Sequence, residues 1–138
     1  MRVDELESAV DSVLASIYRV AVLDDVLSLG SELERSYPVR VRGRLKFRVG
    51  QIVYAAFSLD ERVMGFAFPR EERAALVASH PSKFRLPRES ELRFNWVDAD
   101  LAALDPAEAR ELVVEAWCMV VPKKLSRAYV LAHPGGPG

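Results

Sequence analysis

Residues 39–68 contain three short segments of strand-forming character, and this run most limits the folds open to the chain. The first segment is 39–48, the second is "IVYAAFS" (52–58) and the third is "VMGFAF" (63–68). Each segment is rich in β-branched or aromatic residues, and turn-forming residues lie between them, as is typical of hairpin-linked strands. The sequence therefore predicts an antiparallel meander over 39–68.

Helical patterns precede this meander. In the region 1–35 apolar residues recur at three- and four-residue spacing, which places one stripe on a helix: Leu6, Val10, Val13, Leu14, Ile17 and Ala21. Asp4 and Glu7 predict a helix start near residue 4, and Gly30 is a candidate C-cap. We expect an N-terminal helical region over 1–35, either as one helix or as two with a break near Leu23.

Two more helices and at least one more strand follow the meander. Pro69, with two glutamates after it, predicts the start of a middle helix that ends at His80-Pro81. Alternation in "RFNWVDADL" predicts a strand over 93–98. The run Asp105-Pro106-Ala107-Glu108 combines an N-cap, a proline at N1 and a glutamate at N3, which predicts a last helix ending at Pro122. Residues 131–138 are expected to form a flexible tail.

The order of these elements predicts one domain of the α+β class. The chain has 138 residues and half of them are hydrophobic, which suffices for a single core without disulfides or metal. We expect the N-terminal, middle and C-terminal helices to pack on one face of the antiparallel sheet, which leaves the other face to solvent or to a partner.

Cysteine content and hydropathy indicate a cytoplasmic protein. Cys118 is the only cysteine, so an intramolecular disulfide is excluded, as is typical of a reducing compartment. The first residues lack the cationic start and apolar run of a signal peptide, and no later stretch approaches ~20 apolar residues. We expect no membrane partner.

Basic side chains occupy alternate positions in the first segment of the meander: Arg40, Arg42, Arg44, Lys46 and Arg48. On one continuous strand all five would share one face, because successive side chains point to opposite sides of the pleat. Such a face predicts contact with the phosphates of double-stranded DNA. Further cations would extend the patch if they fold to the same side: Lys83, Arg85, Arg88, Lys123, Lys124 and Arg127.

Other interpretations of this segment remain open. A charged solvent face is common on edge strands, where it discourages aggregation. The chain as a whole carries −1, and residues 1–34 hold eight acids and two bases against six bases and no acid in 35–48, so the N-terminal helix is able to neutralise the basic segment. The alternative function is a protein-interaction or homodimerisation module without nucleic-acid binding, built on the open sheet face or on the apolar last helix.

Three blocks of the chain resemble one known family. They are "FRVGQIVYAAFSLDERVMGFAFPREERAALVASHPSKF" (47–84), Trp96 within "RFNWVDADL", and "ELVVEAWCMVVPKKL" (111–125). Their order and spacing resemble the MmcQ/YjbR family of small bacterial proteins, over a core of residues 36–125. The resemblance implies a compact α+β domain comparable to CyaY-like (frataxin-like) folds and to a double-wing DNA-binding domain. It implies no catalytic motif, and fold alone does not fix function.

Catalytic and metal sites are not predicted, and no cofactor is expected. Cys118 lies between Trp117 and Met119 in an apolar helix with no histidine nearby, which is typical of a buried structural cysteine. Two scattered histidines form a poor basis for a metal site. The acids Asp4, Glu7 and Asp11 on the first helix are explained by the helix dipole. Trp117 is expected in the core, whereas the side of the sheet that Trp96 faces is left undetermined.

Overall fold

The computed structural model describes residues 19–137 as an α+β fold built on a six-stranded antiparallel sheet. The strands lie in the order β1-β2-β3-β4-β6-β5. The strand bounds are β1 (Ser36–Val41), β2 (Arg44–Val49), β3 (Ile52–Phe57), β4 (Val63–Ala67), β5 (Phe84–Arg85) and β6 (Trp96–Asp100). The helix bounds are α2 (Asp24–Glu32), α3 (Arg70–Ser79), α4 (Pro106–Cys118) and α5 (Lys123–Ala132), with short 3-10 helices at Glu89–Glu91 and Leu101–Ala103. The predicted fold class is confirmed.

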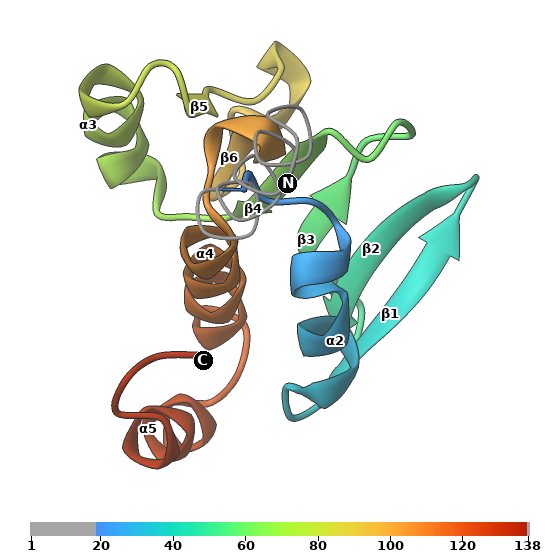
Figure 1. Ribbon diagram of the computed structural model, residues 1–138, viewed down its shortest axis with the longest axis vertical. Helices are drawn as coiled ribbons and strands as arrows, with labels where there is room; N and C mark the ends of the chain where they lie inside the picture. The colour runs from blue at the N-terminus through green and yellow to red at the C-terminus, as the bar shows by residue number, and fades with distance from the viewer. Residues whose placement is uncertain (1–18, 138) are drawn as a thin grey trace, which may run out of the picture.

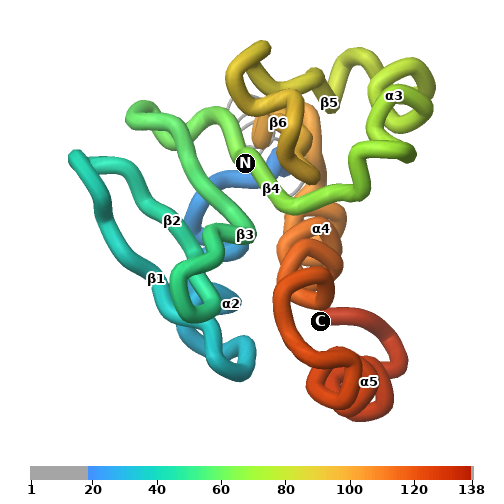
Figure 2. Tube along the Cα trace, turned by 180° about the vertical axis from the view of Figure 1, so that it is seen from behind, coloured from blue at the N-terminus to red at the C-terminus, as the bar shows by residue number. Residues whose placement is uncertain are grey.

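One face of the sheet is covered by helices, and we call this the covered face. Its strands contribute buried side chains at alternate positions: Leu45, Phe47, Ala55, Met64, Phe66, Val97 and Ala99. Helices α2 and α4 lie against this face, and α5 packs on α4 (Figure 1). Figure 2 shows the sheet from behind, where none of the described helices lies over β2, β3 and β4. This second face is called the open face below.

The predicted first strand over 39–48 is wrong, because this segment is a hairpin of β1 and β2. Val41 pairs with Arg44 in antiparallel register, which leaves only Arg42 and Gly43 to form the turn. Their φ angles are +53° and +80°, and a two-residue hairpin of the I′ type needs positive φ at both positions. The meander therefore contains four strands, and it begins at Ser36 rather than at residue 39.

The N-terminal helical region is described only from residue 19 onward. The predicted helix start near residue 4 lies outside the described residues. Helix α2 continues through Gly30 to Glu32, so the predicted C-cap at Gly30 is wrong. Gly30 instead allows close packing, because a Cβ built there would lie 2.5 Å from Cε1 of Phe47. The helix approaches the sheet at this point only because the residue has no side chain.

The predicted start of the last helix is confirmed by its capping geometry. Asp105 accepts a hydrogen bond of 2.8 Å from the backbone N–H of Glu108, and Pro106 is the first helical residue. The helix ends at Cys118 rather than at Pro122. A further helix that the sequence did not predict, α5, follows Pro122 and includes the first two residues of the predicted tail.

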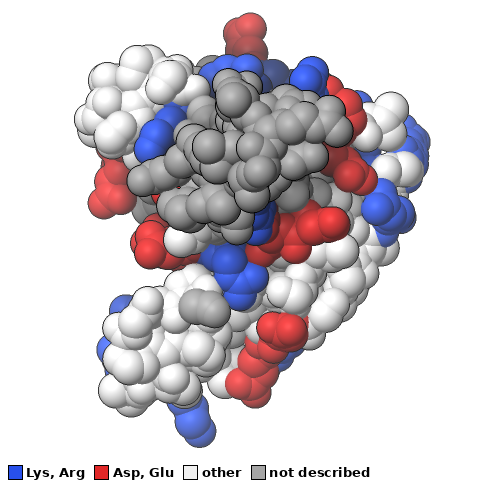
Figure 3. Space-filling model, viewed as in Figure 1, with Lys and Arg blue, Asp and Glu red and all other residues white. Residues whose placement is uncertain are grey.

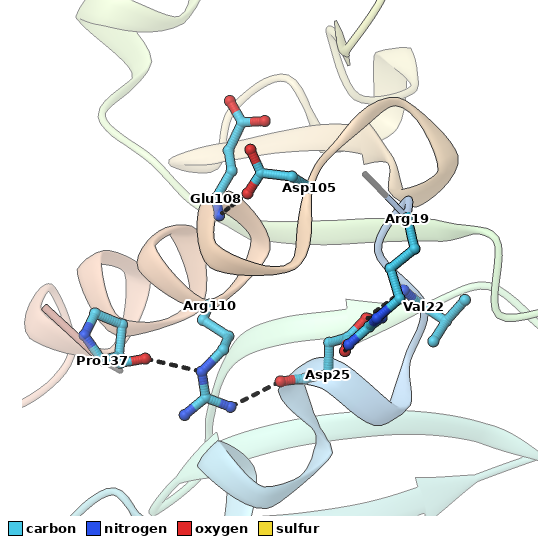
Figure 4. Close-up of polar contacts among 7 residues, drawn as sticks. All are labelled: Arg19, Val22, Asp25, Asp105, Glu108, Arg110 and Pro137. Carbon is cyan, nitrogen blue, oxygen red and sulfur yellow. Dashed lines mark hydrogen bonds and ion pairs between the residues drawn. The ribbon is translucent and has the colours of Figure 1, made fainter. Parts of the chain in front are cut away.

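Arg110 of α4 joins three parts of the chain (Figure 4). Its guanidinium donates to the backbone oxygen of Asp25 in α2 at 2.8 Å and to that of Pro137 at 2.9 Å. Asp25 is itself held by Arg19 at 2.6 Å. This hydrogen bond lowers the pKa of the Asp25 carboxyl below its usual value.

Within residues 19–137, no helix combines the length and apolar character needed to cross a membrane.

Candidate functional site

The basic hairpin, defined as Ser36–Val49, carries five cations and no acid. Arg40, Arg42 and Arg44 are exposed, and Lys46 and Arg48 are half-buried. In the space-filling view Lys and Arg side chains gather at the edge of the molecule where this hairpin turns (Figure 3). The hairpin is therefore a projecting cationic element at one end of the sheet.

The five cations do not share one face. In antiparallel pairs, residues directly opposite each other lie on the same face, and Arg40 pairs with buried Leu45. Arg40 therefore points to the covered side, and Arg42 lies in the turn. Arg44, Lys46 and Arg48 pair with residues of β1 and β3 on the open face. Because the turn has two residues, odd-numbered residues of β1 pair with even-numbered residues of β2, and both sets lie on the open face.

Few contacts neutralise the basic hairpin within the part of the chain that the structure describes. Arg40 lies 3.6 Å from Glu61 and donates to the backbone oxygen of Gly43 at 3.2 Å. Among residues 19–137 this is the one ion pair made by the five cations. Most of the acidic segment invoked for neutralisation lies outside the described residues, so that alternative stays a prediction. Among the acids of this segment that the structure describes, Asp25 is paired with Arg19 rather than with a cation of the basic hairpin.

Most of the remaining predicted cations lie away from the basic hairpin, whereas Arg88 lines the same hollow of the sheet as Arg44 and Lys46. Lys83 is paired with Glu108 at 3.1 Å. Lys123 and Lys124 begin α5, which lies far from the turn of the basic hairpin (Figures 1 and 2). Arg85 pairs with Asp98 in the register of β5 and β6, so it lies on the open face at the opposite edge of the sheet. Arg88 lies nearby, 3.8 Å from Glu91.

A hollow of about 710 Å³, which we call the trough, lies on the open face between these two edges. Its floor is formed by small residues of β3 and β4, among them Ala56, Gly65 and Ala67. Long side chains form its sides: Arg44 and Lys46 from β2, Trp96 and Asp98 from β6, and Arg88, Glu91 and Phe94 from the segment before β6. Its volume falls within the range of small-molecule sites.

The register of β4 and β6 determines the side of the sheet that Trp96 faces. Trp96 pairs with Ala67 and Asp98 pairs with Gly65, which places both side chains on the open face. The indole leans over Gly65, because a Cβ built there would lie 2.5 Å from Nε1 of Trp96 and 2.8 Å from Oδ1 of Asp98. Burial raises the pKa of the Asp98 carboxyl and nearby Glu91 adds to the rise, whereas a hydrogen bond from Trp96 opposes it.

Comparison with known proteins places this fold in a family. A family model named YjbR matches residues 31–119. The chain belongs to the YjbR family. A similar solved structure is the crystal structure of Deinococcus radiodurans protein DR2400, with domain DUF419, at a TM-score of 0.64 and 21% identity, covering 86% of this chain and 91% of that chain. This likeness shows the fold alone. No curated protein matches the chain significantly.

The part of the chain that matches the YjbR family contains the basic hairpin and nearly all of the trough. The match begins before β1 and ends at Met119, so α5 lies beyond it. The charge pattern of the sequence indicates the cations but not the trough residues Ser58, Gly65, Phe94 and Asp98. One pattern indicates Ser58 and Gly65: in "AFS" (56–58) and "MGFA" (64–67) small residues alternate with large buried ones, as expected for strands whose second face is hollowed.

The candidate catalytic groups do not assemble. Burial raises the pKa of the Cys118 thiol, and Glu115 raises it further, so the nucleophilic thiolate is disfavoured at neutral pH. His80 and His133 occupy the C-cap positions of α3 and α5, on different helices. Among residues 19–137, no three histidine, cysteine or acidic side chains are grouped to hold a metal. The acids Asp4, Glu7 and Asp11 lie outside the described residues.

Proposed function

We propose that this YjbR-family chain is a non-catalytic nucleic-acid-binding domain that holds the phosphate backbone of duplex DNA with its basic hairpin. The observation that carries the proposal is the exposure of Arg40, Arg42 and Arg44 around one tight turn, with no acid between Ser36 and Val49. Each phosphate that a cation neutralises releases counterions, which favours binding at low salt.

The dimensions of the basic hairpin suit this role. Each of its strands has six residues, which corresponds to about 20 Å at ~3.3 Å per residue. A two-stranded β-ribbon fits the major groove of B-DNA, where arginines are able to contact phosphates on either side. Arg40 on the covered side, Arg42 in the turn and Arg44 on the open side point in three directions, which suits a ribbon inserted between two backbones.

The first prediction concerns the salt dependence of this binding. We expect the protein to bind a fluorescently labelled generic duplex in anisotropy titrations, with log K falling as log salt rises by about 0.9 per phosphate contacted. The double variant Arg42→Ala, Arg44→Ala removes two contacts, so the slope should become shallower by about 1.8 and affinity should fall at every salt concentration.

A matched control uses two other cations of the chain. Lys123→Ala with Lys124→Ala removes the same charge from α5, which lies away from the basic hairpin (Figure 1). We expect its salt slope to equal that of the unmodified chain. Absence of binding at about 20 mM salt, or the same loss of affinity in both double variants, would contradict the proposal, because binding would then be absent or independent of the hairpin.

A second candidate function, homodimerisation, is favoured by one surface of α5. The apolar half of α4 is buried within the chain, with Trp117 in the core, so it supplies no contact surface. On α5, however, Val130 is 59% exposed and Leu131 is 83% exposed. Leu131→Asp should convert a dimer to a monomer in multi-angle light scattering, since a carboxylate buried at an interface is unpaired. A monomer at all concentrations before substitution would reject this function.

A further inference from the structure

The trough differs in chemical character at its two sides. On β2 it presents two cations, Arg44 and Lys46, whereas around β6 it presents Trp96, Asp98 and the ion pair of Arg88 with Glu91. From this arrangement we propose that the trough binds a nucleoside phosphate, with the phosphate at Arg44 and Lys46 and the base at Trp96 and Asp98. This site goes beyond the proposed binding of duplex DNA, because its ligand is a small molecule and it requires no contact with the turn of the hairpin.

Small residues in the middle of the sheet create the space for such a ligand. Pairing runs without interruption from Lys46 to Ala56, from Ala56 to Gly65, and from Gly65 to Asp98. Lys46 and Asp98 thus stand at the two ends of one row across the sheet. Their backbones are three strand spacings apart, or about 14 Å. Between them lie the methyl group of Ala56 and Gly65. The Trp96 indole and the Asp98 carboxylate fill the space directly over Gly65, so the open part of the row lies over Ala56.

The side formed by β6 suits the edge of a nucleobase. Asp98 accepts a hydrogen bond from the Trp96 indole, yet an ionised carboxylate has about four acceptor positions in all. Its remaining positions match the N–H donors along the edge of guanine. Trp96 and Phe94 add aromatic surface at this end of the trough, and aromatic side chains favour contact with the flat rings of bases.

The side formed by β2 suits a phosphate. Arg44 and Lys46 lie two residues apart on one strand, so both side chains stand on the open face. Neither forms an ion pair with any residue between 19 and 137. Arginine binds phosphate oxygens with two parallel N–H donors, and lysine adds a point charge, so the pair provides both direction and charge.

The two tryptophans make the proposal testable by fluorescence. Trp96 lines the trough, whereas Trp117 is 1% exposed in the core, so a ligand in the trough alters the emission of Trp96 alone. We expect guanosine 5′-monophosphate to change this emission saturably. Inorganic phosphate and guanosine should each bind at least about tenfold more weakly, because each engages one side only. No saturable change, or equal binding of inorganic phosphate, would overturn the proposal.

Variants separate the trough from the basic hairpin. Ala56→Leu fills the floor without removing a charge and should abolish the response to guanosine 5′-monophosphate while duplex binding is retained. Arg42→Ala should weaken duplex binding and leave the response unchanged, since Arg42 does not line the trough. If Ala56→Leu fails to fold, Asp98→Asn keeps the volume and should weaken binding of the nucleotide by about tenfold but not that of phosphate. An unchanged nucleotide affinity in Asp98→Asn would contradict the proposed orientation.

Discussion

Replacing Trp117 by alanine should lower the free energy of unfolding by about 3–5 kcal/mol, the range measured for large aromatic residues in protein cores. The side chain is 1% exposed and is the largest of the fully buried ones. Its ring packs edge-on against the ring of Tyr129 in α5, with the two ring centroids 5.6 Å apart. Its Nε1–H donates a hydrogen bond of 2.9 Å to the backbone oxygen of Glu34. The residue therefore joins α4 to α5 and to the segment before β1, so its loss leaves a cavity and an unpaired carbonyl.

Urea unfolding followed by circular dichroism would measure this loss. Trp117→Phe keeps most of the ring and removes the indole donor, so it should cost clearly less than alanine, on the order of 1–2 kcal/mol for the lost hydrogen bond and the smaller ring. Glu111→Ala, at an exposed position of the same helix, should change stability by less than about 0.5 kcal/mol. A loss of less than about 1 kcal/mol in Trp117→Ala would show that the contacts around the indole contribute little.

The elements that the sequence predicted correctly are those with a local chemical cause. The start of α4 depends on Asp105, Pro106 and Glu108, which act within one turn, and all three occupy the predicted positions. The α+β class follows from the order of strand-like and helical segments, which is likewise local. Helix ends were less predictable, because α4 stops at Cys118 and α5 begins after Pro122 without a side-chain cap.

The basic hairpin was missed because its turn lacks the residues that usually indicate one. Two-residue turns of this type favour asparagine or aspartate before glycine, whereas here Arg42 adopts a positive φ. The alternation of charged and apolar residues also continued through the turn, so nothing in the pattern marked a break. The error mattered for function, since it assigned Arg40 and Arg44 to one face when they lie on opposite faces.

The trough was not predictable from the residues that form it, because they come from strands distant in the sequence. Ala56 and Gly65 lie next to Lys46 and Asp98 only through the register of β2, β3, β4 and β6. That register shifts once, by a bulge between Phe47 and Arg48. A shift of one residue moves every side chain of a strand to the other face. The side of the sheet that Trp96 faces was therefore known only once the structure gave the register.

The second large effect is expected at Phe47, which anchors β2 to α2. The side chain is fully buried, and its ring lies 5.3 Å from that of Phe57 and 6.0 Å from that of Tyr54. Phe47→Ala should lower the free energy of unfolding by about 3–5 kcal/mol in urea titrations. Phe47→Leu removes the ring but fills more of the space, so it should cost less, and a cost equal to that of alanine would contradict a main role of filled core volume.

Gly30 shows whether close packing against Phe47 carries this stability. In a helix, Gly→Ala ordinarily stabilises by about 1 kcal/mol. Here the new Cβ would lie 2.5 Å from the Phe47 ring, so Gly30→Ala should destabilise the chain, with an overpacking cost of about 1–3 kcal/mol that outweighs the helical gain. In the Phe47→Ala background the obstacle is absent, and the same substitution should stabilise by up to about 1 kcal/mol. The change of sign is the decisive result, since equal effects of Gly30→Ala in both backgrounds would mean that helix and ring do not compete for this space.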